Sequence, residues 1–366
     1  MDAALLTGEA FWNDPRPHAA GVVPDVPELA WHVLFETSGS SGNPKWVALR
    51  KQALMASAAA VNRHLRVTRD SCWGLALPLN HVGGFGVAAR VREAGCGMAV
   101  YGRKWEPAAF REWLADEGVT HTSLVPTQVH DLVKAGLTSP GELCAIVVGG
   151  GHLDAVTGQA ARDLGWPVLA SYGMSEAGSQ VATQGLELLE KPYHSAPIPL
   201  LPIWRAAVTE DGLLSISGPA LFSGYVIDGV FRPRATEWHV TSDRVALEDN
   251  SITPLGRADT RVKVLGELVD PESIERELLV LSGGRLVPGT FAVVAVPDAR
   301  AENVLVPVFE APVDTCLMEE VLALYQEQAP GFRRLAPARI MEHFPRSGLG
   351  KLKRSGLVSM AARLSD

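Results

Sequence analysis

One segment of the chain combines small side chains, hydroxyls and a cation in the way a phosphate site requires. Residues 37–45 read T-S-G-S-S-G-N-P-K and directly follow the apolar run 32–35. Small side chains let backbone N–H groups approach an anion, hydroxyls add donors, and Lys45 adds a positive charge. It is not a Walker loop, because the lysine does not directly follow the second glycine. The segment predicts a phosphate-binding loop, and an ordinary Ser/Gly-rich turn is the alternative.

The length and composition predict a soluble protein with two domains. The 366 residues exceed the usual size of one core, and 47% hydrophobic with 20% charged residues is ordinary for globular proteins. The net charge of −8 argues against nucleic-acid and anionic-membrane partners. No apolar run could span a bilayer, which argues against integral membrane association. The four cysteines are scattered, which argues against disulfides and zinc and favours a cytoplasmic location.

Alternating strand and helix patterns from about residue 30 to residue 175 predict a mainly parallel sheet. The predicted helices are 53–65, 107–117, 127–135 and 153–164, and the predicted strands are 71–77, 120–125, 145–148 and 168–171. Ligands of such sheets bind at the carboxyl ends of the strands. We therefore expect three small or polar clusters at such ends: 37–45, 149–152 and 172–180.

The pattern changes after about residue 200. Short strands and turn signals predict a β-rich subdomain with a hairpin at 203–217 and further strands at 238–241, 245–247 and 252–254. Helices at 271–281 and 315–328, with strands between and after them, predict a small α+β domain. We therefore expect a large α/β domain at 1–257 and a small domain at 258–366.

Short motifs along the chain resemble those of the adenylate-forming superfamily, which includes acyl-CoA synthetases, adenylation domains of peptide synthetases and luciferases. They occur in the family's order: the loop at 37–45, P-L-N-H-V-G-G at 78–84, G-G-G at 149–151, Y-G-M-S-E at 172–176, T-S-D at 241–243, G-R-A-D at 256–259 and P-R-S-G-L-G-K at 345–351. The resemblance implies an AMP-forming ligase that uses ATP, Mg²⁺ and CoA on a small carboxylic acid. It also implies that the small domain is a mobile lid.

The first half-reaction joins a carboxylate to the α-phosphate of ATP, so it depends on neutralising and positioning two anions. The resemblance implies that Lys351 bridges them, Glu176 holds Mg²⁺, and Asp243 with Arg257 binds the ribose. Tyr172 would stack on adenine. The other implied nucleotide-binding residues are Thr37, Ser38, Gly39, Ser40, Ser41, Gly42, Lys45, Gly150, Gly173, Met174 and Ser175.

Each of these residues also has an ordinary structural explanation. Lys351 lies close to Lys353 and Arg354, so it can be a solvated lysine of a basic tail. Glu176 can be a carboxylate at a helix N-terminus. Asp243 can belong to a strand-end turn, and Tyr172 can be a partly buried aromatic. The order of the motifs favours the binding roles.

The second half-reaction brings the acyl-adenylate to a thiol, so Lys351 has to leave. The resemblance implies that the small domain rotates about a hinge at Asp259. The segment 263–267 would then face the site, with Lys263 taking part in thioester formation.

Two segments resemble the o-succinylbenzoate–CoA ligases of menaquinone biosynthesis: 78–84 and S-Y-G-M-S-E-A-G-S-Q-V-A-T at 171–183. This implies that His81, Ser179, Gln180 and Thr183 line a pocket for an aromatic dicarboxylate, although His81 can equally be a buried supporting histidine. The chain departs from most of the family, because only 36 residues precede the phosphate loop where a large subdomain is usual. A homodimer partner could cover the sheet surface that this leaves exposed.

Two other functions stay open at this stage. The chain could make only acyl-AMP or load a carrier protein, or it could be a non-catalytic nucleotide-binding remnant. Lys351, Glu176 and Asp243 together argue against the remnant, because a binding protein need not keep all three. A Walker-type kinase is disfavoured by the absence of G-K-[ST].

The substitution Lys351→Ala separates the two half-reactions. We expect it to abolish acyl-adenylate formation, measured as pyrophosphate release, because the two anions are no longer neutralised together. Thioester formation from a supplied acyl-adenylate should be spared. Equal loss of both half-reactions would contradict the two-state scheme.

Overall fold

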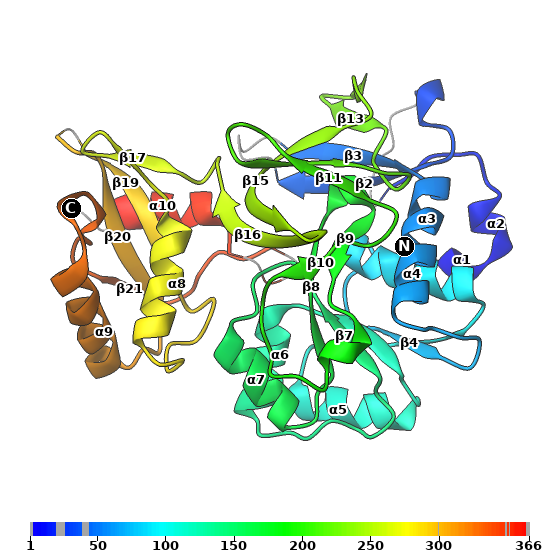
Figure 1. Cartoon of the computed structure of the whole chain (residues 1–366), viewed down its shortest axis with the longest axis horizontal. Helices are drawn as coiled ribbons and strands as arrows, with labels where there is room; N and C mark the ends of the chain where they lie inside the picture. The colour runs from blue at the N-terminus through cyan, green and yellow to red at the C-terminus, as the bar shows by residue number, and fades with distance from the viewer. Residues whose placement is uncertain are drawn as a thin grey trace. The chain divides into compact units, whose positions relative to one another are not determined.

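The structure is a computed structural model that describes residues 3–19, 26–38, 44–298, 300–347, 350 and 352–363. The chain forms two compact units (Figure 1). The first contains Met1–Thr241 and Val245–Pro254, and the second contains Ser242–Arg244 and Leu255–Asp366. The roles predicted for a nucleotide-binding domain at 1–257 and a lid domain at 258–366 stay predictions. Within the described ranges, no helix is long and apolar enough to cross a membrane.

The first unit contains a six-stranded sheet with strand order β5-β4-β6-β7-β8-β9. The first five strands of this order run parallel, and β9 is antiparallel to β8. The strands are β4 (Cys72–Leu75), β5 (Gly97–Val100), β6 (His121–Leu124), β7 (Ala145–Val148), β8 (Val168–Met174) and β9 (Ser179–Thr183). The α/β class with a mainly parallel sheet is thereby confirmed.

The strand order reverses at β4, and this reversal places helices on both faces of the sheet. Right-handed crossovers place the helix after β4 on one face of the sheet and the next three on the other face. The helices are α3 (Lys51–His64), α4 (Val82–Ala94), α5 (Pro107–Asp116), α6 (Pro126–Lys134) and α7 (Ala155–Asp163). Helix α4 packs on β4, β5 and β6, and α5 to α7 form a separate group (Figure 1). A crevice at such a reversal is the usual ligand position in this fold class.

Helix α4 was not predicted. The predicted helices do not include this segment, but the helix begins at Val82, inside the motif 78–84, and includes Gly83 and Gly84. Two neighbouring glycines argue against a helix by propensity, and burial of the helix on all sides, from Gly84 to Val91, overrides that preference.

Two further sheets complete the first unit. One has the order β1-β2-β3-β13-β14 and the other β10-β16-β15-β12-β11. Their strands are β1 (His18–Ala19), β2 (His32–Ser38), β3 (Pro44–Arg50), β10 (Ile198–Pro199), β11 (Arg205–Val208), β12 (Leu213–Ser217), β13 (Gly224–Ile227), β14 (Val230–Pro233), β15 (His239–Glu248) and β16 (Ser251–Arg257). The short helices are α1 (Ala3–Thr7), α2 (Glu9–Trp12) and the 3₁₀ turns at Pro27–Leu29, Ser175–Ala177 and Leu186–Leu188.

Two predictions about these strands are wrong. The segment 37–45 does not lie at the carboxyl end of the parallel sheet, because β2 and β3 pair antiparallel in the separate sheet, with Thr37 opposite Lys45. The predicted strands 238–241 and 245–247 form one strand, β15. In both cases the pairing of backbone between strands decides the structure, and the residue types within each segment do not report it.

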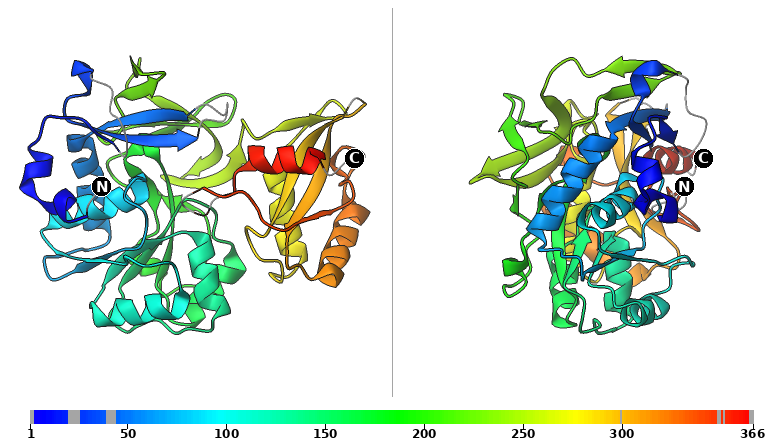
Figure 2. Two further views of the ribbon diagram at one scale, coloured as in Figure 1. Left: turned by 180° about the vertical axis from the view of Figure 1, so that it is seen from behind. Right: turned by 90° about the vertical axis from the view of Figure 1, so that its right-hand side faces the viewer.

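The second unit is a three-stranded sheet between helices. Its elements are β17 (Val262–Val264), β18 (Glu267–Val269), α8 (Pro271–Leu281), β19 (Phe291–Asp298), β20 (Glu302–Glu310), α9 (Thr315–Gln328), η4 (Gly331–Arg333), β21 (Arg339–Met341) and α10 (Arg354–Arg363). Alternate residues of β19 and β20 face opposite sides. Phe291 and Phe309 pack with α8 and α9, whereas Val294 and Val306 pack with α10. Figure 2 shows α10 on the side of the sheet away from α8 and α9.

Capping residues explain where three of the predicted helices begin. Asp154, Asp270 and Asp314 precede α7, α8 and α9, and each accepts a hydrogen bond from a backbone N–H in the first turn. A side-chain oxygen at this position satisfies a donor that the helix itself cannot pair. Local signals of this kind made these helix starts predictable.

The two glycines of α4 provide a matched pair of substitutions. A Cβ on Gly84 would lie 2.3 Å from the carbonyl oxygen of Pro78, whereas a Cβ on Gly83 would meet only Leu77 Cδ1 at 3.4 Å. We expect Gly84→Ala to lower the free energy of unfolding by about 1–3 kcal/mol, because backbone has to move. Gly83→Ala should change it by less than about 1 kcal/mol, towards stability. Denaturant unfolding of both variants checks this, and equal effects would contradict the close approach.

Candidate functional site

In the first unit, three side chains from separate parts of the chain form a charged cluster beside the predicted phosphate loop. The ammonium of Lys45, on β3, lies 3.7 Å from Glu176 Oε1 and 4.0 Å from the ring centroid of Tyr225. The hydroxyl of Tyr225, on β13, donates to the same Glu176 oxygen at 3.0 Å. Burial, followed by the charge of Glu176, raises the pKa of Tyr225 far above its usual value, so the hydroxyl stays a donor.

The rest of the predicted phosphate loop is only partly described. Thr37, at the end of β2, donates through its hydroxyl to the carbonyl oxygen of Lys45 at 3.3 Å. Ser38 is the last residue of β2 and pairs with Pro44. Gly39, Ser40, Ser41 and Gly42 lie outside the described residues. The described ends show that the loop connects two antiparallel strands.

A tight hairpin between β8 and β9 carries Glu176. Gly173 pairs with Gln180 and Met174 pairs with Ser179, and the register shifts between Tyr172 and Gly173. A Cβ on Gly173 would lie 1.7 Å from the carbonyl oxygen of Ser179, so no larger residue fits without moving the backbone. Ser175 and Glu176 lie in the 3₁₀ turn that connects the strands. Four predicted residues, two at the end of β8 and two in the turn, are therefore held in one hairpin.

On the other side of this hairpin, Ser179 lies next to a buried arginine. Arg90, on α4, is 1% exposed, and its guanidinium contacts Ser179 Oγ at 3.4 Å and Ser123 Oγ at 3.2 Å. It also lies 4.9 Å from the ring of Trp73. Burial lowers the pKa of Arg90 to about 9, which still leaves it charged at neutral pH. No carboxylate pairs with it among the residues that the structure describes.

The remaining predicted residues of the first unit lie along the same strand ends. Gln180 and Thr183 are buried, and the Thr183 hydroxyl donates to Gln180 Oε1 at 2.7 Å. His81 is the residue before α4, and Tyr172 is half-buried on β8. Gly150 follows the carboxyl end of β7 with φ +78°. Direct contact of these residues with an acid or a nucleotide stays a prediction.

In the second unit, Arg257 connects Asp243 and Asp259. Its guanidinium donates to both oxygens of Asp259, at 2.8 and 2.6 Å, and reaches Asp243 Oδ1 at 3.4 Å. The hydrogen bond from Arg257 lowers the pKa of Asp259, and the same bond raises that of Arg257. The residues predicted for the ribose and for the hinge thus share one arginine.

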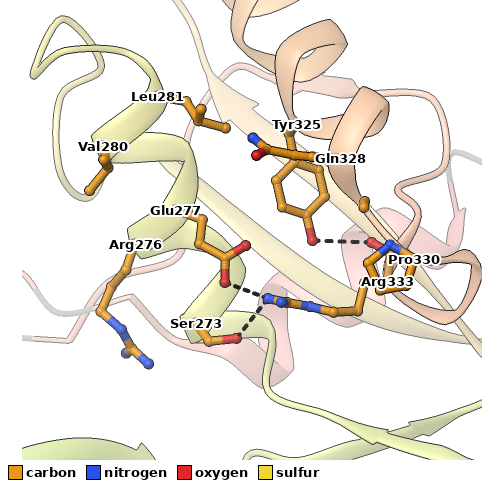
Figure 3. Close-up of a pocket in the computed structure, with 10 residues that line it drawn as sticks. Ser273, Arg276, Glu277, Val280, Leu281, Tyr325, Gln328, Pro330 and Arg333 are labelled. Carbon is orange, nitrogen blue, oxygen red and sulfur yellow. Dashed lines mark hydrogen bonds and ion pairs between the residues drawn. The ribbon is translucent and has the colours of Figure 1, made fainter.

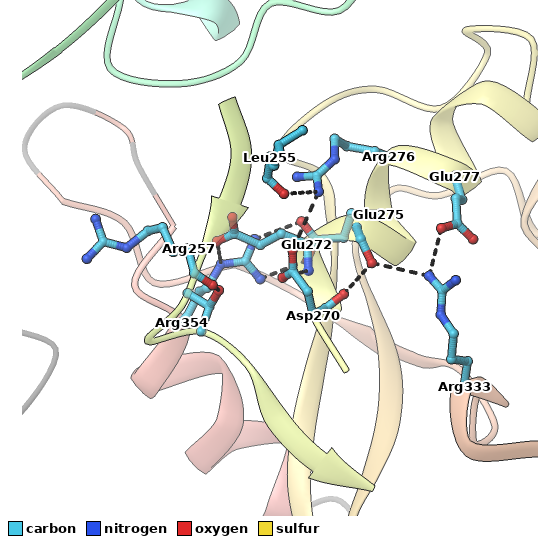
Figure 4. A network of polar contacts seen from close by, with 11 residues as sticks. Leu255, Arg257, Asp270, Glu272, Glu275, Arg276, Glu277, Arg333 and Arg354 are labelled. Atoms are coloured by element: carbon cyan, nitrogen blue, oxygen red, sulfur yellow. Dashed lines mark hydrogen bonds and ion pairs between the residues drawn. The ribbon is translucent and has the colours of Figure 1, made fainter. Parts of the chain in front are cut away.

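Lys351 lies outside the described residues, but both ends of its segment are anchored. Arg346 pairs with Glu310 and forms an antiparallel bridge with Leu352. Arg354, at the start of α10, donates to both oxygens of Glu275 on α8, at 2.8 and 2.7 Å (Figure 4). Its Nε lies 3.0 Å from Glu272. The residues on each side of the segment are therefore fixed to the second unit.

The other predicted residue of this unit, Lys263, lies on the β17–β18 hairpin. It pairs with Leu268 and its side chain is exposed. The turn is made by Leu265 and Gly266, both with positive φ. A role in thioester formation stays a prediction.

A groove of about 620 Å³ lies elsewhere in the second unit, between α8 and α9 (Figure 3). It is lined by Ser273, Arg276, Glu277, Val280, Leu281, Tyr325, Gln328, Ala329, Pro330 and Arg333. Arg333 donates to Glu277 at 2.7 Å and to Ser273 at 3.2 Å, so its charge is already paired. The lining contains none of the predicted site residues.

Two residues of these clusters were missed in the sequence. Arg90 stands in the run F-G-V-A-A-R-V, and a lone cation among apolar residues of a buried helix was the available signal. Tyr225 follows a glycine on a short strand, and nothing local distinguishes it from a core aromatic. Both contacts bring together residues that are 49 or more positions apart.

The chain is similar to known ligases in sequence and in fold. A 2-succinylbenzoate–CoA ligase of Enterococcus faecalis is 28% identical over 342 residues, which cover 87% of this chain and 67% of that protein. A variant of E. coli MenE with bound OSB-AMS has a TM-score of 0.75 and 25% identity, over 91% of this chain and 69% of that chain. The Bacillus subtilis MenE complex with ATP and magnesium has a TM-score of 0.73 at 23% identity, over 89% of this chain and 68% of that chain. At this identity the likeness shows only that the two chains share a fold.

The family model described as AMP-binding enzyme matches residues 8–226. This range covers β2, β3, α4, the six-stranded sheet and the β8–β9 hairpin. It includes Lys45, Arg90, Glu176 and Tyr225. Because the match covers more than half of its residues, the chain belongs to the AMP-binding enzyme family.

Proposed function

We propose that this chain is an ATP-dependent acid–thiol ligase that activates o-succinylbenzoate as its acyl-adenylate and transfers it to CoA, in menaquinone biosynthesis. The family supports the adenylation chemistry, and the relatives named above support the acid. The observation that carries the choice of acid is the buried cation of Arg90 beside Ser179.

A buried guanidinium without an anion is costly, because the charge has lost its water. Arg90 has two long hydroxyl contacts and an aromatic face, and the indole N–H of Trp73 beside it has no hydrogen-bond partner among the described residues. A carboxylate in contact with Arg90 would compensate this cost through a charge-assisted pair. The arrangement therefore favours an acid that keeps one carboxylate while another reacts.

o-Succinylbenzoate has two carboxylates, so it meets this requirement, whereas a simple fatty acid does not. In the first half-reaction an oxygen of the reacting carboxylate attacks the α-phosphorus of ATP, and the bond to pyrophosphate breaks. In the second, the thiol attacks the acyl carbon and AMP leaves. Arg90 would hold the spectator carboxylate and so fix the orientation of the acid through both steps.

The charged cluster in the first unit fits the phosphate end of ATP. The Oε2 oxygen of Glu176 has no partner among the described residues, and Lys45 supplies a cation at the end of the phosphate loop. Magnesium shared with phosphates needs only one or two carboxylates, so a single available oxygen fits this ion. When bound, Mg²⁺ would neutralise phosphate charge. Thr37 and Lys45 would bind phosphate oxygens.

The remaining roles of the proposal come from the motifs. Lys351 bridges the two anions, Asp243 and Arg257 bind the ribose, and Lys263 acts in the second half-reaction after rotation about Asp259. CoA is the proposed acceptor, and a carrier protein is the alternative. The homodimer and the cytoplasmic location stay predictions.

Pyrophosphate release tests the choice of acid. We expect release with o-succinylbenzoate and ATP, and thioester only when CoA is added. Benzoate and a medium-chain fatty acid serve as matched acids that lack the second carboxylate. Turnover of either of these without turnover of o-succinylbenzoate would exclude the menaquinone assignment.

Arg90 can be tested by comparing KM values. Arg90→Gln should raise the KM for o-succinylbenzoate about 100-fold, because loss of one partner of a buried charge pair typically costs 2–5 kcal/mol, and leave the KM for ATP nearly unchanged. Arg92→Gln is the matched control, since Arg92 lies on the same helix and pairs at the surface with Glu9. Melting temperatures of both variants report folding. A parallel rise in both KM values for Arg90→Gln would argue for a structural role instead.

A further inference from the structure

Tyr225 contacts both charged residues of the predicted phosphate end, and the sheet explains how. Strand β13 pairs antiparallel with β3, and Tyr225 lies opposite Val47. Lys45 is two residues from Val47 on the same strand, so its side chain lies on the same face. Diagonal neighbours on one face are within reach of aromatic and long side chains. The ring of Tyr225 therefore meets the ammonium of Lys45 at 4.0 Å.

The hydroxyl end of Tyr225 reaches across to the β8–β9 hairpin. It donates to Glu176 Oε1 at 3.0 Å, and the backbone of that hairpin is tied to the same region, because Phe222 N–H donates to the Glu176 carbonyl oxygen at 2.8 Å. The Phe222 ring packs against Tyr225 with centroids 4.7 Å apart. The tyrosine is thus held by its own neighbours and by Glu176.

From these contacts we infer that Tyr225 is a positioning residue for nucleotide binding, and that it orients the Glu176 carboxylate for Mg²⁺ while holding Lys45 beside it. This inference rests on the proposed function. The hydroxyl occupies Oε1 and so leaves Oε2 for the ion. Hydrogen bonds to a ligating carboxylate fix its orientation in this way in many metal sites.

The position of Lys45 gives Tyr225 a second effect. At 3.7 Å from Glu176 Oε1, the ammonium is close enough to compete with a metal ion for the carboxylate. The face of the Tyr225 ring attracts the ammonium and keeps it to one side of the carboxylate. The same residue therefore holds the cation near the phosphates and leaves one carboxylate oxygen for the metal.

The two possible roles of Tyr225, supporting the fold and orienting Glu176, lead to different expected results when its hydroxyl is removed. Loss of a supporting hydroxyl would lower stability and weaken nucleotide binding equally with and without metal. Loss of an orienting hydroxyl would weaken only the binding that depends on Mg²⁺. The contrast between Mg²⁺ and EDTA therefore separates the two roles.

Calorimetric titration of ATP without any acid, in Mg²⁺ and in EDTA, provides this contrast. We expect Tyr225→Phe to weaken ATP binding in Mg²⁺ about tenfold, since loss of a hydrogen bond to a ligating carboxylate typically costs 10–100-fold. The affinity in EDTA should stay unchanged, because the ring remains. Tyr193→Phe is the matched control: its buried hydroxyl donates to Leu153 O at 3.4 Å, away from Glu176.

Tyr225→Leu removes the ring as well as the hydroxyl. We expect Tyr225→Leu, unlike Tyr225→Phe, to weaken ATP binding in EDTA about threefold, because Lys45 loses an aromatic contact. Melting temperatures report whether each variant is folded. An unchanged EDTA affinity for this variant would contradict the role assigned to the ring.

Glu176→Gln distinguishes failure of this inference from failure of the proposed function. If Glu176→Gln loses the Mg²⁺ effect and Tyr225→Phe keeps it in full, Tyr225 does not orient the carboxylate, and the proposed function still stands. If Glu176→Gln also keeps the Mg²⁺ effect, Glu176 is not a metal ligand and the proposed nucleotide site fails with it.

Discussion

The close approach of Gly173 to Ser179 is the constraint on which the rest of the first unit's site depends. An added Cβ at Gly173 would lie 1.7 Å from the Ser179 carbonyl oxygen, so only glycine permits this hairpin. The turn points Glu176 towards Lys45 and Tyr225 and brings Ser179 to Arg90. One short segment therefore carries a metal-binding candidate at one end and an acid-binding candidate at the other. Chemistry that joins a phosphate to a carboxylate requires such proximity.

Arg90 differs from other arginines of the chain in its charge pairing. Arg257 is paired with Asp259, Arg354 with Glu275 and Arg92 with Glu9. Arg90 is buried with hydroxyls and an aromatic ring only. Because an unpaired buried charge is unfavourable, its retention there favours a role in binding an anion over a role in stability.

Predictions from the sequence are accurate where structure is decided locally. Asp154, Asp270 and Asp314 mark three helix starts, and the alternation of strands and helices is consistent with the parallel sheet that was found. Predictions from the sequence failed where strand pairing or burial decides the structure. The segment 37–45 turned out to connect two antiparallel strands, and Gly83 and Gly84 lie inside a helix. The residue types in a loop and the helix propensity of a segment do not indicate which strand will pair with it in a sheet.

What the sequence by itself determined is the type of chemistry. Small residues, hydroxyls, carboxylates and lysines occur in an order that indicates adenylation, and the family match bears this out. Only the tertiary structure decided which residues act together. Arg90 meets Ser179, and Tyr225 meets Glu176 and Lys45, although 49 to 180 positions separate them. The physical reason is that motifs report side-chain type, whereas hydrogen bonds and ion pairs depend on distances that exist only after the strands have paired.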